Sequence, residues 1–162
     1  MSAAPEQEML TDYLEAIAEV AIAVEEAKAA IGDLPVDAEG LTAFDSGRRL
    51  ASRALLKSVE QMQDLLGRAM RVTLVLEQVD LSGLSPRAIA DTAEKLGMLS
   101  DGGSWAALVR LRNELVHEYP LSRARQLLRL RDAWQASEEL GKVRESLVAY
   151  VRDRSLLDDA DG

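Results

Sequence analysis

The sequence contains no cysteine and only one histidine, His117, and both shortages restrict its chemistry. Without thiols the chain cannot build a disulfide framework, a zinc-thiolate site, an iron-sulfur cluster or a thiol nucleophile. One imidazole per chain also cannot form a multi-histidine metal site within a monomer. We therefore expect no metal site and no resident cofactor in this chain.

Long apolar runs are also missing. No window approaches the roughly 18 uncharged apolar residues that a membrane span requires, and residues 1–7 lack the basic and apolar regions of a signal peptide. We expect a cytoplasmic protein that does not enter a membrane. The length of 162 residues, with 48% apolar and 29% charged residues, predicts one domain over residues 1–162, with flexible tails at 1–5 and 158–162.

Basic residues are scarce near the N-terminus, although the net charge of the chain is −9. Residues 1–45 carry eleven acids and one base, Lys28, whereas 15 of the 18 bases that follow are arginine. The net charge argues against a broad basic groove for nucleic acid. Arginine is nevertheless the bidentate partner of phosphate and carboxylate. The alternative is that these arginines cap helices and pair with the acidic segment.

Aromatic residues make up only 4% of the chain, and the alternation typical of strands is nearly absent. The apolar period is helical almost everywhere. These patterns predict an all-α fold, an up-and-down bundle of about five helices. The expected helices span about 6–31, 42–78, 86–96, 104–119 and 123–157.

Several residues predict where these helices begin and end. Ser85, Ser104 and Ser122 are expected N-caps, because a serine hydroxyl accepts from the free N–H groups of the first turn. Gly97 and Pro120 are expected to end the helices that precede them. In the second helix, Gly67 and the β-branched residues at 72–73 leave open whether it is one rod or two pieces.

The fourth expected helix carries an arginine on its apolar side. Its stripe runs Trp105, Leu108, position 112, Leu115 and Tyr119, and position 112 is Arg112. An inward arginine costs desolvation free energy unless a carboxylate, a ligand phosphate or a partner chain meets it. A structural ion pair within the chain is the plainer alternative to a functional role.

Other polar residues gather on the same helix. Asn113 and His117 lie four apart and share a face, and Glu114 and Glu118 are candidates to position Arg112 or His117. Each has a plainer alternative. His117 sits in the last turn, where the helix dipole favours an imidazolium; both glutamates could be solvated acids, and Tyr119 could simply cap the core.

The string Leu-Arg-Asn-Glu-Leu-Val-His-Glu-Tyr-Pro over residues 111–120 resembles the signature of the HEPN superfamily, Arg-x4–6-His. With Tyr119 two residues after His117, it is similar to the HepT toxins of toxin-antitoxin pairs. The resemblance implies an all-α domain that dimerises through this helix, with Arg112 and His117 as ribonuclease residues supported by Asn113. It also implies that a partner minimal nucleotidyltransferase, using ATP and Mg²⁺, silences the toxin by AMPylation of Tyr119.

A second branch of the same superfamily is also similar. The segment from Ser85 to Asn113 resembles the non-catalytic substrate-binding or nucleotide-binding subunits of minimal nucleotidyltransferases. A third interpretation needs no family: a helical interaction protein whose acidic first helix docks a basic partner.

Metal-independent RNA cleavage gives an independent reason to expect a dimer. A base must take the proton of the ribose 2′-hydroxyl, an acid must protonate the leaving 5′-oxygen, and a cation must stabilise the charged phosphorane. His117 suits proton transfer near neutral pH, and Arg112 suits the phosphate oxygens. The acid and the base are most simply supplied by His117 from each of two chains. We therefore expect a homodimer with a shared cleft.

Overall fold

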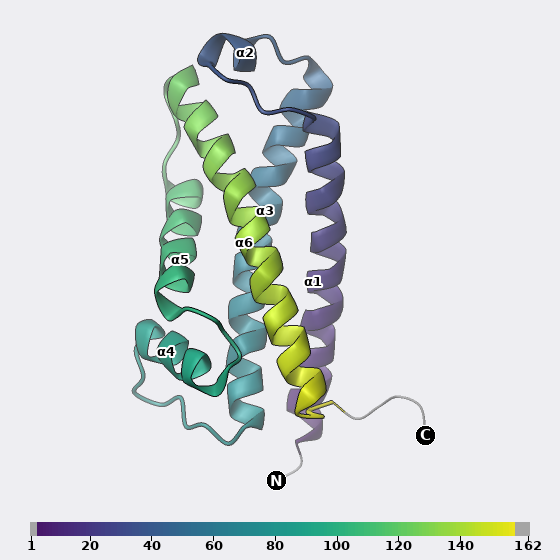
Figure 1. The fold of residues 1–162 in the computed structure, drawn as a ribbon, viewed down its shortest axis with the longest axis vertical. Helices are drawn as coiled ribbons and strands as arrows, with labels where there is room; N and C mark the ends of the chain where they lie inside the picture. The colour runs from purple at the N-terminus through teal and green to yellow at the C-terminus, as the bar shows by residue number, and fades with distance from the viewer. Residues whose placement is uncertain (1–2, 158–162) are drawn as a thin grey trace.

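The computed structural model describes residues 3–157, which form six helices and no strand. The prediction of an all-α bundle is confirmed for these residues, with one helix more than expected. The helices are α1 (Ala4–Ile31), α2 (Ala38–Thr42), α3 (Ser46–Leu76), α4 (Pro86–Leu96), α5 (Gly102–His117) and α6 (Arg123–Asp153) (Figure 1).

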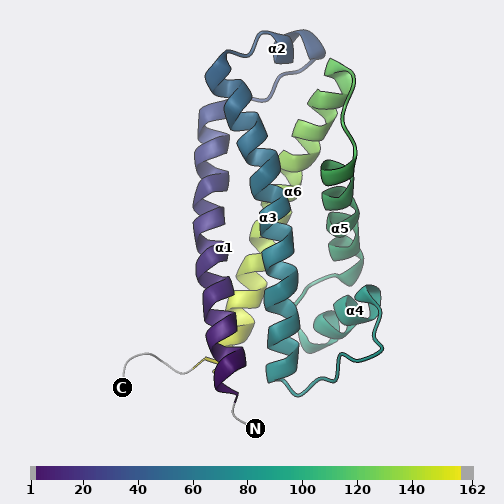
Figure 2. The ribbon, with the colours of Figure 1, turned by 180° about the vertical axis from the view of Figure 1, so that it is seen from behind.

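Three long helices form the body of the bundle. Helices α1 and α3 lie side by side, and α6 crosses them on one side (Figures 1 and 2). Helix α5 lies beside α3 and α6, α4 sits at the end where α1 begins, and α2 covers the opposite end. The fully buried core side chains come mainly from the three long helices: Leu10, Ile17, Ile31, Leu55, Leu66, Met70, Leu74, Leu130, Leu140 and Leu147.

Helix α3 is one continuous rod, which settles the question that its sequence left open. Gly67 stands where the helix passes Trp105: a Cβ on Gly67 would lie 3.5 Å from the indole ring, an ordinary contact distance. Thr73 is fully buried, and its hydroxyl donates to the Ala69 carbonyl at 2.7 Å. The β-branched threonine is therefore satisfied inside the helix and does not break it.

The first helices begin differently from the prediction. Helix α1 starts at Ala4, so Ala4 and Pro5, expected in a flexible tail, form its first turn, where proline is tolerated. Residues 1–2 and 158–162 of the expected tails lie outside the described residues. The expected single start near residue 42 is wrong, because Asp37 caps the short α2 and Asp45 caps α3. Each aspartate accepts from a backbone N–H three residues later.

The start and end of α4 are as predicted. Ser85 accepts from the Ala88 N–H, and Gly97 takes the left-handed conformation at φ 83°. The predicted cap of α5 is wrong, because Asp101, and not Ser104, holds that position. Bonds from the Ser104 hydroxyl and the Gly103 N–H lower the pKa of Asp101. Gly102 lets the chain pass close to α4, since a Cβ there would lie 2.9 Å from the Asp91 carboxylate and would displace that side chain.

Helix α6 begins as predicted and ends early. Ser122 accepts from the Arg125 N–H, but the helix stops at Asp153, before the expected residue 157. Near its end the Tyr150 hydroxyl donates to Glu77 at 2.6 Å, and Arg154 donates to the same oxygen at 2.6 Å. Burial and the bond to Glu77 raise the pKa of Tyr150. This cluster ties the end of α6 to the end of α3.

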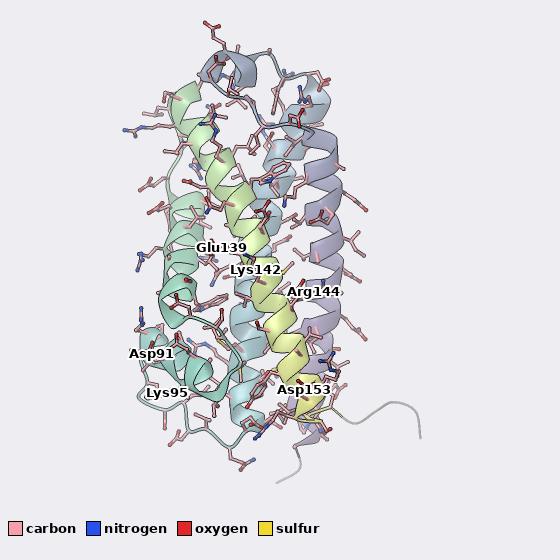
Figure 3. All side chains as sticks on the ribbon, in the orientation of Figure 1. Asp91, Lys95, Glu139, Lys142, Arg144 and Asp153 are labelled. Atoms are coloured by element: carbon pink, nitrogen blue, oxygen red, sulfur yellow. The ribbon has the colours of Figure 1, made fainter. Side chains whose placement is uncertain are left out.

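Many charged side chains lie on the outside of the bundle. Figure 3 shows Asp91 and Lys95 on α4 and Lys142 on α6, all away from the end that α2 covers. Several arginines instead bind backbone carbonyls: Arg48 binds that of Ile31 at the end of α1, and Arg131 binds that of Pro35 in the loop between α1 and α2. The interpretation of arginines as helix caps is therefore confirmed for part of the set. Within the described residues, no arginine forms an ion pair with an acid of the N-terminal segment.

No helix among residues 3–157 has the length and apolarity that crossing a membrane requires.

We expect Leu66→Ala to destabilise the bundle by about 2–5 kcal/mol, because it removes a fully buried side chain from the middle of α3 and leaves a cavity. The measurement is chemical denaturation followed by circular dichroism at 222 nm. The matched control is Ile22→Ala on α1, whose side chain is 60% exposed and whose loss should change the free energy of unfolding by less than about 0.5 kcal/mol. Equal effects of the two variants would contradict the described core.

Candidate functional site

Arg112 is half-buried and meets a carboxylate of its own chain. Its Nη2 lies 2.8 Å from Oδ2 of Asp64 on α3, and its Nη1 donates to the Asn113 side chain at 3.2 Å. The Arg112 Nε is buried with no hydrogen-bond partner in the described residues. The carboxylate that the inward arginine requires is therefore Asp64, a residue that the sequence analysis did not single out.

Arg112 and His117 do not share a face of α5. Five helical positions turn a side chain by about 140° around the axis. His117 is exposed and lines a cavity, whereas Arg112 is not among the residues that line it. Within one chain the structure therefore does not bring the two predicted catalytic residues together.

The cavity that His117 lines has a volume of about 670 Å³. It lies at the end of the bundle that α2 covers, where the start of α3, the end of α5 and the start of α6 meet (Figure 1). The chain between α5 and α6 forms part of its wall, including Glu118 and Tyr119. The predicted residues His117, Glu118 and Tyr119 are thus brought together here, while Asn113 and Glu114 are not in the lining.

Four arginines line the same cavity: Arg49, Arg53, Arg123 and Arg129. Glu118 is the one acidic residue in this lining. Within residues 3–157, none of the four arginines has a carboxylate at ion-pair distance. The cavity is therefore a positively charged site in a chain whose net charge is −9, and such a site attracts anions.

The end of α5 is shaped by Pro120 and Arg129. The helix stops at His117, short of the predicted 119, and Glu118 is already extended. Pro120 disfavours helical backbone at Tyr119, the residue before it, and has no N–H to donate to a helical carbonyl, so the helix cannot continue through this segment. Arg129 of α6 donates to the carbonyl of Leu115 at 2.6 Å and to that of Glu118. These bonds satisfy carbonyls that the helix end leaves free, and they hold the segment around His117 against α6.

Tyr119 does not continue the apolar stripe of α5. Trp105 and Leu108 are buried as predicted, each 7% exposed, and Leu115 is half-buried. Tyr119 is 84% exposed, because the helix has ended before it. The alternative that Tyr119 caps the core is therefore wrong. Its phenol is open to a reacting partner.

Asn113, Glu114 and Glu118 are all exposed. Asn113 accepts a hydrogen bond from Arg112, and its supporting role in catalysis stays a prediction. The carboxylate on Arg112 is Asp64, and neither glutamate takes that place. A role of Glu114 or Glu118 in positioning His117 stays a prediction.

Asp64 and the cavity arginines are the site residues that sequence reasoning missed. A signal for Asp64 existed, since α3 contains six basic residues but only two acids, Glu60 and Asp64. The excess of arginine could also be read from the sequence. The sequence did not reveal that four arginines line one cavity, because Arg49 and Arg129 lie far apart in the chain and are brought together only by the packing of α3 and α6.

The available chemistry is that of an imidazole, a phenol and several guanidinium groups. His117 can transfer a proton near neutral pH, the arginines can bind phosphate, and the exposed Tyr119 can act as a nucleophile. Among the residues that the structure describes, no three His, Asp or Glu side chains gather closely enough to hold a metal ion.

A double-mutant cycle tests the pair on α5 and α3. We expect Arg112→Ala and Asp64→Ala to show a coupling of about 0.2–1 kcal/mol in the free energy of unfolding, the range of a partly exposed ion pair. The coupling should fall at high salt, because ions screen exposed charges. Additive effects of the two substitutions at low salt would show that the pair contributes nothing to the free energy of unfolding.

No protein-family model matches this chain, and no curated protein or solved structure matches it either. The resemblance of residues 85–120 to the HEPN superfamily therefore rests only on the motif residues themselves.

Proposed function

We propose that the protein is a HEPN-like ribonuclease toxin of a toxin-antitoxin pair, acting in the cytoplasm on RNA. One observation carries the proposal: His117 and Tyr119 lie exposed on the wall of a cavity of about 670 Å³ that four arginines line. The arginines supply a site for phosphate, and His117 supplies a proton-transfer group beside it. The resemblance of residues 111–120 to HepT toxins supports the same function.

The proposed reaction needs no metal ion. The 2′-oxygen of the ribose attacks the adjacent phosphorus as its proton passes to a neutral imidazole, and the bond from phosphorus to the 5′-oxygen breaks. The leaving oxygen takes a proton from an imidazolium. The products are a 2′,3′-cyclic phosphate and a free 5′-hydroxyl. Guanidinium groups stabilise the negative charge that develops on the phosphoryl oxygens.

The reaction is best served by a homodimer. One chain contains one histidine, and the acid and the base must act on opposite sides of the phosphorus. His117 ends α5 on an exposed surface with Tyr119, and exposed apolar side chains lie nearby, with Val116 at 41% and Leu121 at 87% exposure. An isologous contact through this end of α5 would bring two His117 side chains to one cleft.

We further propose that a partner minimal nucleotidyltransferase silences the toxin at Tyr119. The Tyr119 oxygen attacks the α-phosphorus of ATP, held with Mg²⁺ by the partner, and pyrophosphate leaves. The phenol is 84% exposed and lines the arginine cavity. An AMP group there adds a phosphate and a nucleobase beside His117, so it would occupy the space that RNA needs.

A second candidate function is a non-catalytic, nucleotide-binding subunit of such a nucleotidyltransferase. The ion pair between Arg112 and Asp64 favours it, because this pair neutralises the guanidinium that the catalytic interpretation assigns to the phosphate. In this function His117 and the cavity arginines bind a nucleotide, and no RNA is cleaved. The two candidate functions therefore differ in their expected activity: the ribonuclease cleaves RNA and needs the His117 imidazole to do so, whereas the nucleotide-binding subunit does not cleave RNA.

The first test is RNA cleavage by the purified protein in the presence of EDTA. We expect His117→Ala to lower the rate at least about 100-fold, the usual contribution of general acid-base catalysis. Denaturing gels of a labelled RNA give the rate, and mass spectrometry should find the 2′,3′-cyclic phosphate end.

Arg110→Ala is the matched control for His117→Ala. Arg110 is exposed on the same helix and is not among the residues that line the cavity. Its rate should equal that of the unchanged protein, and circular dichroism should show equal helix content in both variants. Cleavage that survives His117→Ala undiminished would end the ribonuclease proposal, and absence of cleavage in all three proteins would favour the nucleotide-binding subunit.

The second test is modification of Tyr119. Incubation with ATP, Mg²⁺ and a minimal nucleotidyltransferase encoded beside this protein should increase the intact mass by one AMP group. Tyr119→Phe should stay unmodified, because it lacks the nucleophilic oxygen, whereas Tyr13→Phe on α1 should be modified as usual. An adduct that persists in Tyr119→Phe would place the acceptor elsewhere.

A further inference from the structure

We propose that Arg53 of α3 binds a phosphate of the RNA strand, in the role of substrate cation that sequence reasoning gave to Arg112. This inference rests on the proposed function, because it takes RNA as the ligand of the cavity. It adds a substrate-binding residue from a second helix, outside the segment that carries the family resemblance.

Arg53 differs from the other cavity arginines in having no partner. The Arg49 Nη1 donates to the Phe44 carbonyl at 2.6 Å, and the Arg123 Nη1 donates to the Gln126 side chain at 2.9 Å. Both Nη atoms of Arg129 bind carbonyls at the end of α5. Within residues 3–157 the structure gives Arg53 no hydrogen bond and no ion pair, although its side chain is exposed at the cavity. Its planar donor fork is free for a ligand.

Arg49 and Arg53 present two positive charges on one face of α3. They lie four residues apart, so they are neighbours on the helix surface, where like charges repel. Ser52 and Leu56 of the same face also line the cavity. An anion between the two guanidinium groups would relieve the repulsion. Glu118 is the one carboxylate in the lining, and it forms no ion pair with either arginine in the described residues.

The other residues of the lining favour a phosphodiester over a carboxylate as the ligand. Arg53 comes from α3, whereas His117 ends α5 and Tyr119 follows it. A phosphate that Arg53 binds in this cavity therefore lies in the same space as the proton-transfer group. The exposed ring of Tyr119 offers a surface on which a base can stack. An acidic protein segment would use the arginines but would leave the imidazole and the ring without a role.

Arg112 is less suited to this role because its guanidinium is already neutralised. Its Nη2 lies 2.8 Å from Asp64, and its side chain is 25% exposed and not in the lining of the cavity. A phosphate that bound Arg112 would have to displace the carboxylate. Arg53 carries no such cost.

The test separates binding from cleavage. The probe is a short fluorescein-labelled 2′-O-methyl RNA, which lacks the nucleophile and cannot be cleaved, and the readout is fluorescence anisotropy over a salt series. We expect Arg53→Gln to raise the Kd about tenfold and to reduce the slope of log K against log salt by about 0.7, the loss of one phosphate contact on a single strand. Arg53→Lys should fall between, because lysine keeps the charge but loses the planar fork.

Arg68→Gln is the matched control. Arg68 is an exposed arginine on the same helix and is not among the residues that line the cavity. We expect its Kd and salt slope to equal those of the unchanged protein. Thermal unfolding should show that all three variants fold, since both arginines are exposed and neither forms a hydrogen bond or an ion pair within residues 3–157.

The outcomes distinguish this inference from the proposed function. Weaker binding by Arg53→Gln supports the inference even if His117→Ala cleaves RNA as the unchanged protein does, in which case only the ribonuclease proposal fails. Unchanged binding by Arg53→Gln overturns the inference even if His117→Ala abolishes cleavage. A change in oligomeric state of Arg53→Gln with unchanged RNA binding also overturns it, because the arginine would then belong to a protein interface.

Discussion

The structure depends on the burial of the apolar side of α3. This helix packs against α1, α4, α5 and α6, and its fully buried side chains, Leu55, Leu66 and Leu74 among them, form the centre of the core. Burial of each such side chain contributes about 1.5–3 kcal/mol to folding. A rotation or a break of α3 would expose several of them and would cost much of the stability of the bundle. The rotation of α3 about its axis, set by these side chains, also decides where its polar residues lie. Arg53 at one end and Asp64 in the middle are placed by the core.

The end of α5 is held by a second, smaller set of interactions. A helix end exposes carbonyl groups that must be satisfied, and here Arg129 of α6 binds those of Leu115 and Glu118. Pro120 prevents the helix from continuing. As a result His117 occupies the last helical position and Tyr119 stands clear of the core. The local backbone thus exposes an imidazole and a phenol at the place where α3 and α6 contribute their arginines.

Much of the fold follows from local signals in the sequence, whereas the site follows from packing. The helical period predicts the helices, and Ser85 and Ser122 predict where α4 and α6 begin, because capping involves residues only a few positions apart. Asp101 was missed as a cap because Ser104 offers an equally suitable hydroxyl three residues later. The sequence did not decide whether Tyr119 is buried or exposed, since the apolar spacing of the α5 sequence continues through position 119. The pairing of Arg112 with Asp64 joins residues 48 apart, and no local pattern reveals such a partner.

The charge of the chain is best understood as a separation between two regions. Most acids of the N-terminal segment lie on α1, where they surround a buried stripe. The others, Asp33, Asp37, Glu39 and Asp45, belong to the chain around α2, and no acid of the segment is in the lining of the cavity. The cavity has one acid and four arginines. Because salt screens charges beyond about 8–10 Å, the four arginines and the one acid that line the cavity act on a phosphate there more strongly than the acids outside the lining. The net charge of −9 therefore discourages binding along the whole surface of the protein while leaving one end able to hold an anion. Such a distribution suits a small, selective phosphate site better than a broad groove for long nucleic acid.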